Sequence, residues 1–177
     1  MSCTDNLNRA TDYLLNTLRS AGLENVHTEN AQVPDWERGF ETAELITPHK
    51  QRFNILGLGT SVGTPKGGII GEVIAVESFD EFETLSEDVV RGKIVVFVPT
   101  FVSYGVTVSY RQSAARVASR KGAIAALVRS ITPYSIGSPH TGGQSYENGV
   151  KKIPVAALTV EDAEMLLRIY RRGDKNN

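Results

Sequence analysis

Lys93-Ile94-Val95-Val96-Phe97-Val98 is a continuous run of β-branched and aromatic residues, from which the architecture can be worked out. Such an uninterrupted apolar run is typical of a strand that is buried on both faces. A similar run, Ala123-Ile124-Ala125-Ala126-Leu127-Val128, follows a segment with helical periodicity at 110–121 and a glycine at 122. A strand, a helix and a strand in this order form a βαβ crossover, so we expect the two strands to be parallel.

Further elements are predicted on both sides of this unit. Residues 42–47 and the β-rich stretch 69–76 indicate strands before it, and residues 80–85 a short helix. After it, residues 153–158 indicate a last strand. Thr159, with Asp162 three residues further on, can cap a final helix at about 160–172.

The segment 131–150 between the last two predicted strands contains two prolines and four glycines, which predicts a long irregular loop. Long loops in compact domains tend to be functional. Because α/β sheets present functional loops after their parallel strands, we take this loop as the part that faces a ligand. Its candidate residues are His140, Ser138 and Thr141.

The N-terminal segment is predicted to be an arm. Apolar residues at 7, 10, 14, 18 and 21 share one face of a helix that Thr4 or Asp5 can cap. Residues 26–33 alternate weakly, which favours a strand. We therefore expect a helix-strand arm over 1–35 and one mixed α/β domain over 36–177, a sheet or open barrel flanked by helices at about 110–121 and 160–172.

Composition excludes several classes of function. The 177 residues carry 19 basic and 20 acidic side chains, so we expect neither nucleic acid nor a membrane as partner. One cysteine excludes a disulfide framework, and three histidines without ligand spacing give no metal or cofactor site within this chain. No stretch is apolar enough to cross a membrane, and the N-terminus lacks a signal peptide.

Other motifs give weaker predictions. Gly57-x-Gly59 followed by Gly63 has one residue too many for a dinucleotide fingerprint, so a nucleotide-binding α/β domain is a third alternative. No G-x-S-x-G elbow is present, and we assign no catalytic residue. Four side chains are candidates for an interface with another domain or partner, because Trp and Arg are common anchors and leucines line the first helix: Trp36, Arg38, Leu14 and Leu18.

Several segments, taken in order, resemble the carboxypeptidase Q family of zinc exopeptidases. They are Trp36-Glu37-Arg38-Gly39, Ile55-Leu56-Gly57-Leu58-Gly59, Gly63-Thr64-Pro65, Arg91-Gly92-Lys93-Ile94-Val95-Val96, Ser138-Pro139-His140-Thr141-Gly142 and Lys152-Ile153-Pro154 followed by Thr159-Val160-Glu161-Asp162-Ala163-Glu164-Met165. The middle of the chain is also similar to protease-associated (PA) domains in general, which share the landmarks at 92–96, 121–123 and 153–155.

The resemblance implies that residues 36–177 are a PA domain inserted in a zinc-dependent dipeptide-cleaving carboxypeptidase, and that the arm belongs to the start of its peptidase domain. In the family the zinc ligands come after the inserted domain, and no position here matches one. It also implies a secreted or lysosomal parent protein and an accessory role over the substrate cleft, with the peptidase domain as partner in cis. A free-standing module that binds a peptide or a protein is the alternative. Nothing in the residues decides whether the chain forms a homo-oligomer.

Overall fold

A five-stranded mixed sheet forms the centre of the fold. The computed structural model describes residues 4–33 and 35–173, which fall into two compact units, Met1–Glu37 and Arg38–Asn177. In the second unit the strands lie in the order β3-β7-β6-β5-β4. They are β3 (Ile55–Gly57), β4 (Val73–Val76), β5 (Ile94–Phe97), β6 (Ala125–Arg129) and β7 (Val155–Leu158). Strands β4 to β7 are parallel to one another, and β3 is antiparallel to β7.

The predicted βαβ crossover is confirmed. Strands β5 and β6 pair in parallel, with Val96 opposite Leu127, and α4 (Tyr104–Arg120) connects them. This helix begins well before the predicted residue 110, because the Ser103 hydroxyl caps it by accepting a hydrogen bond from the Val106 amide. The sequence did not indicate the early start, since a glycine at 105 and β-branched residues at 106–108 are poor helix formers.

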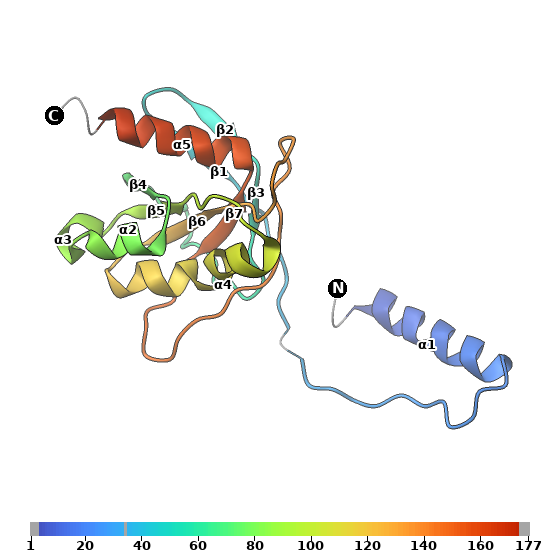
Figure 1. Cartoon of the computed structure of the whole chain (residues 1–177). Helices are drawn as coiled ribbons and strands as arrows, with labels where there is room; N and C mark the ends of the chain where they lie inside the picture. Colours follow the sequence, from blue (N-terminus) through green and yellow to red (C-terminus); the bar gives the residue numbers. More distant parts are fainter. Residues whose placement is uncertain (1–3, 34, 174–177) are drawn as a thin grey trace. The chain divides into compact units, whose positions relative to one another are not determined.

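Helices cover both faces of the sheet (Figure 1). On one face lie α4, α2 (Phe79–Thr84) and α3 (Glu87–Val90), and on the other lies α5 (Val160–Gly173). Alternate residues of β5 face opposite sides of the sheet: Val95 packs in the cluster with α4, and Val96 packs in the cluster with α5. Burial on both faces explains why the run at 94–98 has no polar residue.

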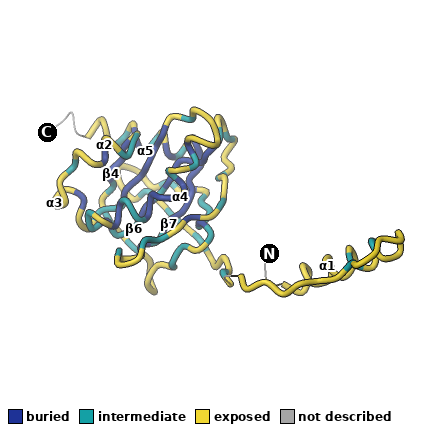
Figure 2. The backbone as a smooth tube through the Cα atoms, turned by 60° about the horizontal axis from the view of Figure 1, so that its bottom comes forward, coloured by how far each residue is buried: buried dark blue, intermediate teal, exposed yellow. Residues whose placement is uncertain are grey.

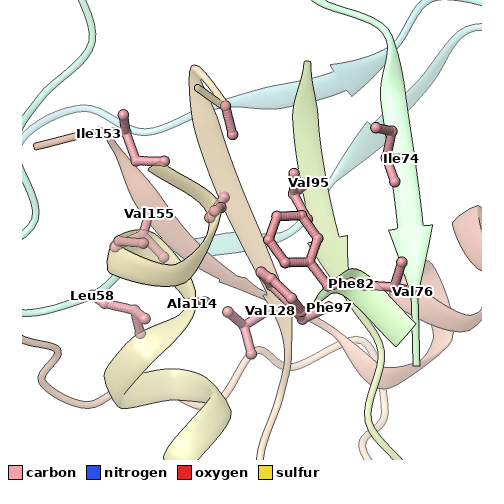
Figure 3. Packing of buried hydrophobic residues seen from close by; sticks show 14 of the residues in the cluster. Leu58, Ile74, Val76, Phe82, Val95, Phe97, Ala114, Val128, Ile153 and Val155 are labelled. Atoms are coloured by element: carbon pink, nitrogen blue, oxygen red, sulfur yellow. The ribbon is translucent and has the colours of Figure 1, made fainter. Parts of the chain in front are cut away.

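The cluster on the α4 side contains an aromatic centre. Phe82 and Phe97 are both fully buried, and their ring centroids lie 5.4 Å apart in an edge-to-face arrangement (Figure 3). Phe79 contacts Phe97 in the same way, with 5.2 Å between the centroids. Such pairs contribute about 0.5–1.5 kcal/mol beyond the area that they bury, so α2 is fixed to the sheet through these rings.

A separate two-stranded hairpin lies on the α5 side. It consists of β1 (Ala43–Leu45) and β2 (Gln51–Phe53), which pair antiparallel. Phe53 packs in the cluster beneath α5, and the Gln51 side-chain amide donates a hydrogen bond to Asp162 at 3.2 Å. The predicted cap of α5 is confirmed, because the Asp162 amide donates to the Thr159 hydroxyl at 3.0 Å.

The described residues of the first unit form the helix α1 (Asp5–Ser20), as predicted. Thr4 caps it by accepting from the Leu7 amide at 3.3 Å. The predicted strand at 26–33 is wrong: this segment is irregular and exposed along almost its whole length (Figure 2). A strand needs a neighbour for its backbone N–H and C=O groups, and no strand in residues 4–33 or 35–173 pairs with it.

We expect α1 to be only marginally stable in the isolated chain. It has 16 residues, none of them buried, and isolated helices near that length are marginal in water. In hydrogen–deuterium exchange by mass spectrometry, the amides of residues 5–20 should exchange far faster than those of β5 and β6. Protection of α1 equal to that of β5, in a preparation shown to be monomeric, would contradict this expectation.

Candidate functional site

The loop at 131–150 leaves the carboxyl end of β6 and returns to β7, as the sequence predicted. Among the described residues, its regular pairing with other segments is one parallel bridge between Gly143 and Gly59. The Gly59 amide donates to the Gly142 carbonyl at 2.8 Å, and the Gln144 amide donates to the Gly59 carbonyl at 3.2 Å. Thr60 adds a bond from its hydroxyl to the Gln144 carbonyl at 2.7 Å. The loop is therefore irregular in shape but tied to the sheet.

These contacts show how the glycines at 57–63 are used. Gly59 brings its backbone against Gly143, whose Cα lies 3.5 Å from where a Gly59 side chain would begin. No helix begins in residues 58–72. A dinucleotide site needs a helix N-terminus directly after the glycines to receive the pyrophosphate, so the structure does not support the nucleotide alternative.

A buried arginine of α4 holds the centre of the loop. Arg111 is 7% exposed. Its Nη1 donates to the Thr141 carbonyl at 3.1 Å, and its Nη2 donates to the Tyr104 hydroxyl at 2.7 Å. The guanidinium also lies 5.4 Å from the centre of the Tyr104 ring. Its hydrogen-bond partners in the described part of the chain are neutral. The side chain is therefore a positive charge fixed beneath the loop, which it supports through the Thr141 carbonyl.

A second arginine, Arg38, contacts the same loop, although it lies about a hundred residues earlier in the sequence. Arg38 Nη2 donates to the Thr141 hydroxyl at 2.9 Å and to the Gly57 carbonyl at 2.8 Å. Its Nε forms an ion pair with Glu41 at 2.7 Å, and Glu41 in turn accepts from the Gly57 amide at 2.7 Å. Thr141 is thus bound on its side chain by one arginine and on its carbonyl by another, Arg111.

His140 is exposed, but its backbone and one ring nitrogen are fixed. The His140 amide donates to the hydroxyl of buried Ser130 at 2.7 Å. Its Nδ1 lies 3.0 Å from the Ile131 carbonyl, and because a carbonyl only accepts, Nδ1 carries a proton. The ring also contacts Tyr104 edge-on, with 6.1 Å between centroids. The remaining nitrogen, Nε2, makes no hydrogen bond with the described residues.

The structure joins Thr141 to Arg38 and places the neighbouring His140 against Tyr104. Ser138 is exposed and lines an open hollow of about 510 Å³ with Asn54 and Pro139. Trp36 is half-buried within the first unit, where Leu14 is 56% exposed and Leu18 half-buried. The roles suggested for all seven candidate side chains stay predictions.

Sequence reasoning missed Arg111, although a pattern could have revealed it. The buried stripe of α4 contains Ala114, Ala115 and Ala118. Arg111 precedes these residues by three, four and seven positions, which places it on the same face. A charged residue in register with an apolar stripe must find hydrogen-bond partners inside the protein, and here it finds them in the loop.

The start of the loop is held by a carboxylate of α5. The Ser135 hydroxyl donates to Glu161 at 2.6 Å and accepts from the Val160 amide at 3.1 Å. The hydrogen bond from Ser135, together with backbone N–H groups, holds the pKa of Glu161 below its usual value of 4.5. The ionised carboxylate therefore joins this part of the loop to the helix start.

This contact should be lost in acid. A carboxyl whose pKa is lower in the folded state stabilises the fold above its unfolded pKa and loses that contribution as pH falls through the folded value. The amide signals of Ser135 and Ile136 should titrate with a midpoint below 4.5, the ordinary value of Glu161. Glu161→Gln should abolish this titration, whereas Glu24→Gln, in the first unit, should leave it unchanged. A midpoint at or above the ordinary value would contradict the assignment.

The described residues contain no metal site. No group of three or more His, Cys, Asp or Glu side chains in residues 4–33 and 35–173 could hold a metal ion. Within the same residues no helix is both long and apolar enough to cross a bilayer. The arrangement can orient a ligand through fixed donors and an exposed imidazole.

Residues 63–166, which include β4 to β7 and the whole loop at 131–150, match the model of the PA domain. The chain belongs to the PA domain family. It is 52% identical over 175 residues to carboxypeptidase Q of Xenopus laevis and 46% identical over 175 residues to that of Homo sapiens. In both cases 99% of this chain is covered but only 37% of the relative. The PA domain chain thus spans a little over a third of the length of these carboxypeptidases.

Solved structures of peptidases share the fold of this PA domain chain. A peptidase M28 precursor from Shewanella amazonensis superposes with a TM-score of 0.91 at 28% identity, covering 98% of this chain and 40% of that one. A zinc aminopeptidase from Bacillus subtilis has a TM-score of 0.63 at 19% identity over 93% of this chain and 36% of its own. The second likeness is one of fold alone. The fold predicted from the sequence, a PA domain with a sheet flanked by helices, is confirmed.

Proposed function

We propose that this chain is an accessory part of a carboxypeptidase Q-like zinc peptidase that hydrolyses dipeptides, and that it covers the substrate cleft. The identity of 46–52% to carboxypeptidase Q relatives over nearly the whole chain carries the proposal. The zinc of such an enzyme does not fit the residues described here, because they contain no cluster of ligands. The metal and the peptidase domain are therefore assigned to the remainder of the protein, whose secreted or lysosomal location forms part of the same proposal.

Within this role, residues 138–141 face the substrate. His140 presents an Nε2 that makes no hydrogen bond with the described residues, while its backbone is fixed by Ser130 and the next residue by Arg38 and Arg111. Groups held in one geometry before binding lose little conformational entropy when a ligand arrives. An imidazole Nε2 can accept a hydrogen bond from an N–H group or, when protonated, donate one to a carboxylate. A short peptide has both N–H groups and a terminal carboxylate.

The test uses the chain in two settings. Alone, with added zinc, it should not hydrolyse dipeptides; zinc-dependent hydrolysis by the purified chain would overturn the accessory role. In a chimera it replaces the matching 175 residues of the Xenopus laevis enzyme, and there His140→Ala should raise KM by roughly tenfold, the equivalent of a lost hydrogen bond to a charged group. The matched control is His49→Ala, which removes another exposed histidine. An unchanged KM in the His140 variant would remove the loop from the substrate site.

A further inference from the structure

We infer that a cavity at the carboxyl edge of the sheet binds a free α-amino acid with an apolar side chain. The inference goes beyond the proposed function, because no residue of 138–141 lines this cavity. Its walls come from residues that directly follow β4 and β5, from the last residue of β6, from Pro133 and from α5. Parallel sheets commonly bind ligands outside the carboxyl ends of their strands. The volume is about 320 Å³, at the small end of the range for ligand pockets.

Arg129 provides a buried, oriented cation. Its side chain is 7% exposed. Nη1 donates to the carbonyls of Ser130 and Thr132, both at 3.1 Å, and Nε lies 3.5 Å from a carboxylate oxygen of Glu164. No hydrogen bond within the described residues uses Nη2. The guanidinium is therefore fixed by its other nitrogens and keeps one amino group for a ligand carboxylate, which is the acceptor that arginine binds best.

Two carboxylates line the same cavity. Glu77 and Glu164 are about half exposed, at 45% and 47% of their side chains. Glu77 is paired with Arg171, and Glu164 with Arg129. A carboxylate has roughly four lone-pair sites, so each can accept a ligand ammonium while it keeps its arginine. The lining thus offers acceptors for a positive group beside a donor for a negative one.

This charge arrangement selects a zwitterion. The lining contains one cation and two anions, so a ligand with only a carboxylate meets repulsion from Glu77 and Glu164. A ligand with only an ammonium meets the buried guanidinium of Arg129. An α-amino acid carries both groups on one carbon, and each finds its complement within this one cavity.

The rest of the cavity wall is apolar. Val98 and Leu167 are 4% and 7% exposed, and Phe101 is half-buried. Pro99 and Pro133 add two rings without backbone donors. An aliphatic side chain such as that of leucine would bury against these groups, whereas a charged side chain would be desolvated without a partner. Thr100 lies exposed at the rim.

The binding test is an NMR titration of the ¹⁵N-labelled full chain with L-leucine. The amide signals of Thr100, Phe101 and Leu167 should shift in a saturable way. N-acetyl-L-leucine lacks the ammonium and L-leucinamide lacks the carboxylate, so each should bind about tenfold or more weakly, because one charged partner is left unpaired. Leucyl-leucine, whose charges are further apart, should also bind more weakly. No shifts with L-leucine, or equal binding of any of these analogues, would overturn the inference.

A blocking variant locates the site. Thr100→Trp should fill the cavity from its rim and abolish the shifts, without disturbing the core, because Thr100 is exposed. The matched control is Thr64→Trp, at an exposed threonine that does not line the cavity; it should leave leucine binding unchanged. Binding that persists in the folded Thr100→Trp protein would place the ligand elsewhere and refute the site.

Discussion

Phe97→Ala should lower the free energy of unfolding by about 3–5 kcal/mol, as expected for removal of a large buried aromatic side chain. Phe97 is fully buried and contacts the rings of Phe79 and Phe82. The variant leaves a cavity between β5 and α2 and removes both edge-to-face contacts. The measurement is urea unfolding followed by circular dichroism, with the midpoint and the slope fitted separately.

Phe40→Ala is the matched control for this substitution. It deletes the same atoms from a phenylalanine that is 89% exposed, and surface changes of this kind usually stay within about 0.5 kcal/mol. A large loss at Phe40, or a loss below about 1 kcal/mol at Phe97, would show that the core is not centred on these rings.

Gly142→Ala should destabilise the protein by about 1–3 kcal/mol, the usual range for overpacking. A Cβ at this position would lie 2.3 Å from Cζ and 2.5 Å from Nε of Arg111. The arginine is buried and bonded to the Thr141 carbonyl and the Tyr104 hydroxyl, so it cannot move without losing these bonds. Amide exchange in residues 138–144 should also become faster, because the loop loses its hydrogen bond from Arg111.

Gly143→Ala is the control for this clash. A Cβ on Gly143 meets nothing within 4 Å, and the change should be close to neutral. Arg111→Ala combined with Gly142→Ala gives a double-mutant cycle: the pair should cost less than the sum of the single changes, since the clash disappears with the guanidinium. Additive losses would mean that Gly142 and Arg111 do not interact.

The parallel core was predictable because its causes are local in the sequence. The apolar run at 93–98 must be buried on both sides, and a helix between it and the run at 123–128 leaves a right-handed crossover as the usual connection. The structure places α4 on one face and α5 on the other, which satisfies that requirement. Caps such as Thr159 also follow from a few neighbouring residues.

Features that depend on distant partners were harder to predict. The alternation at 26–33 favours a strand, but a strand forms only when another strand satisfies its backbone, and the described residues supply none. The candidate loop was found from its prolines and glycines and from its place after a parallel strand. Two arginines restrain this loop: Arg38, over a hundred positions earlier in the chain, and Arg111. These contacts depend on the tertiary fold. Only the position of Arg111 on the buried face of its helix is visible in the sequence.

The hydrogen bonds that Glu41 and Arg38 make with the Gly57 backbone have a consequence for association between chains. β3 is an edge strand of the sheet, and an open edge is a template on which foreign strands add and aggregates grow. Here Glu41 accepts from the Gly57 amide and Arg38 donates to the Gly57 carbonyl, so side chains of the same molecule occupy the backbone groups that an incoming strand would need. The ion pair therefore keeps the backbone of Gly57 from pairing with a foreign strand, and we expect its disruption to favour aggregation at this edge.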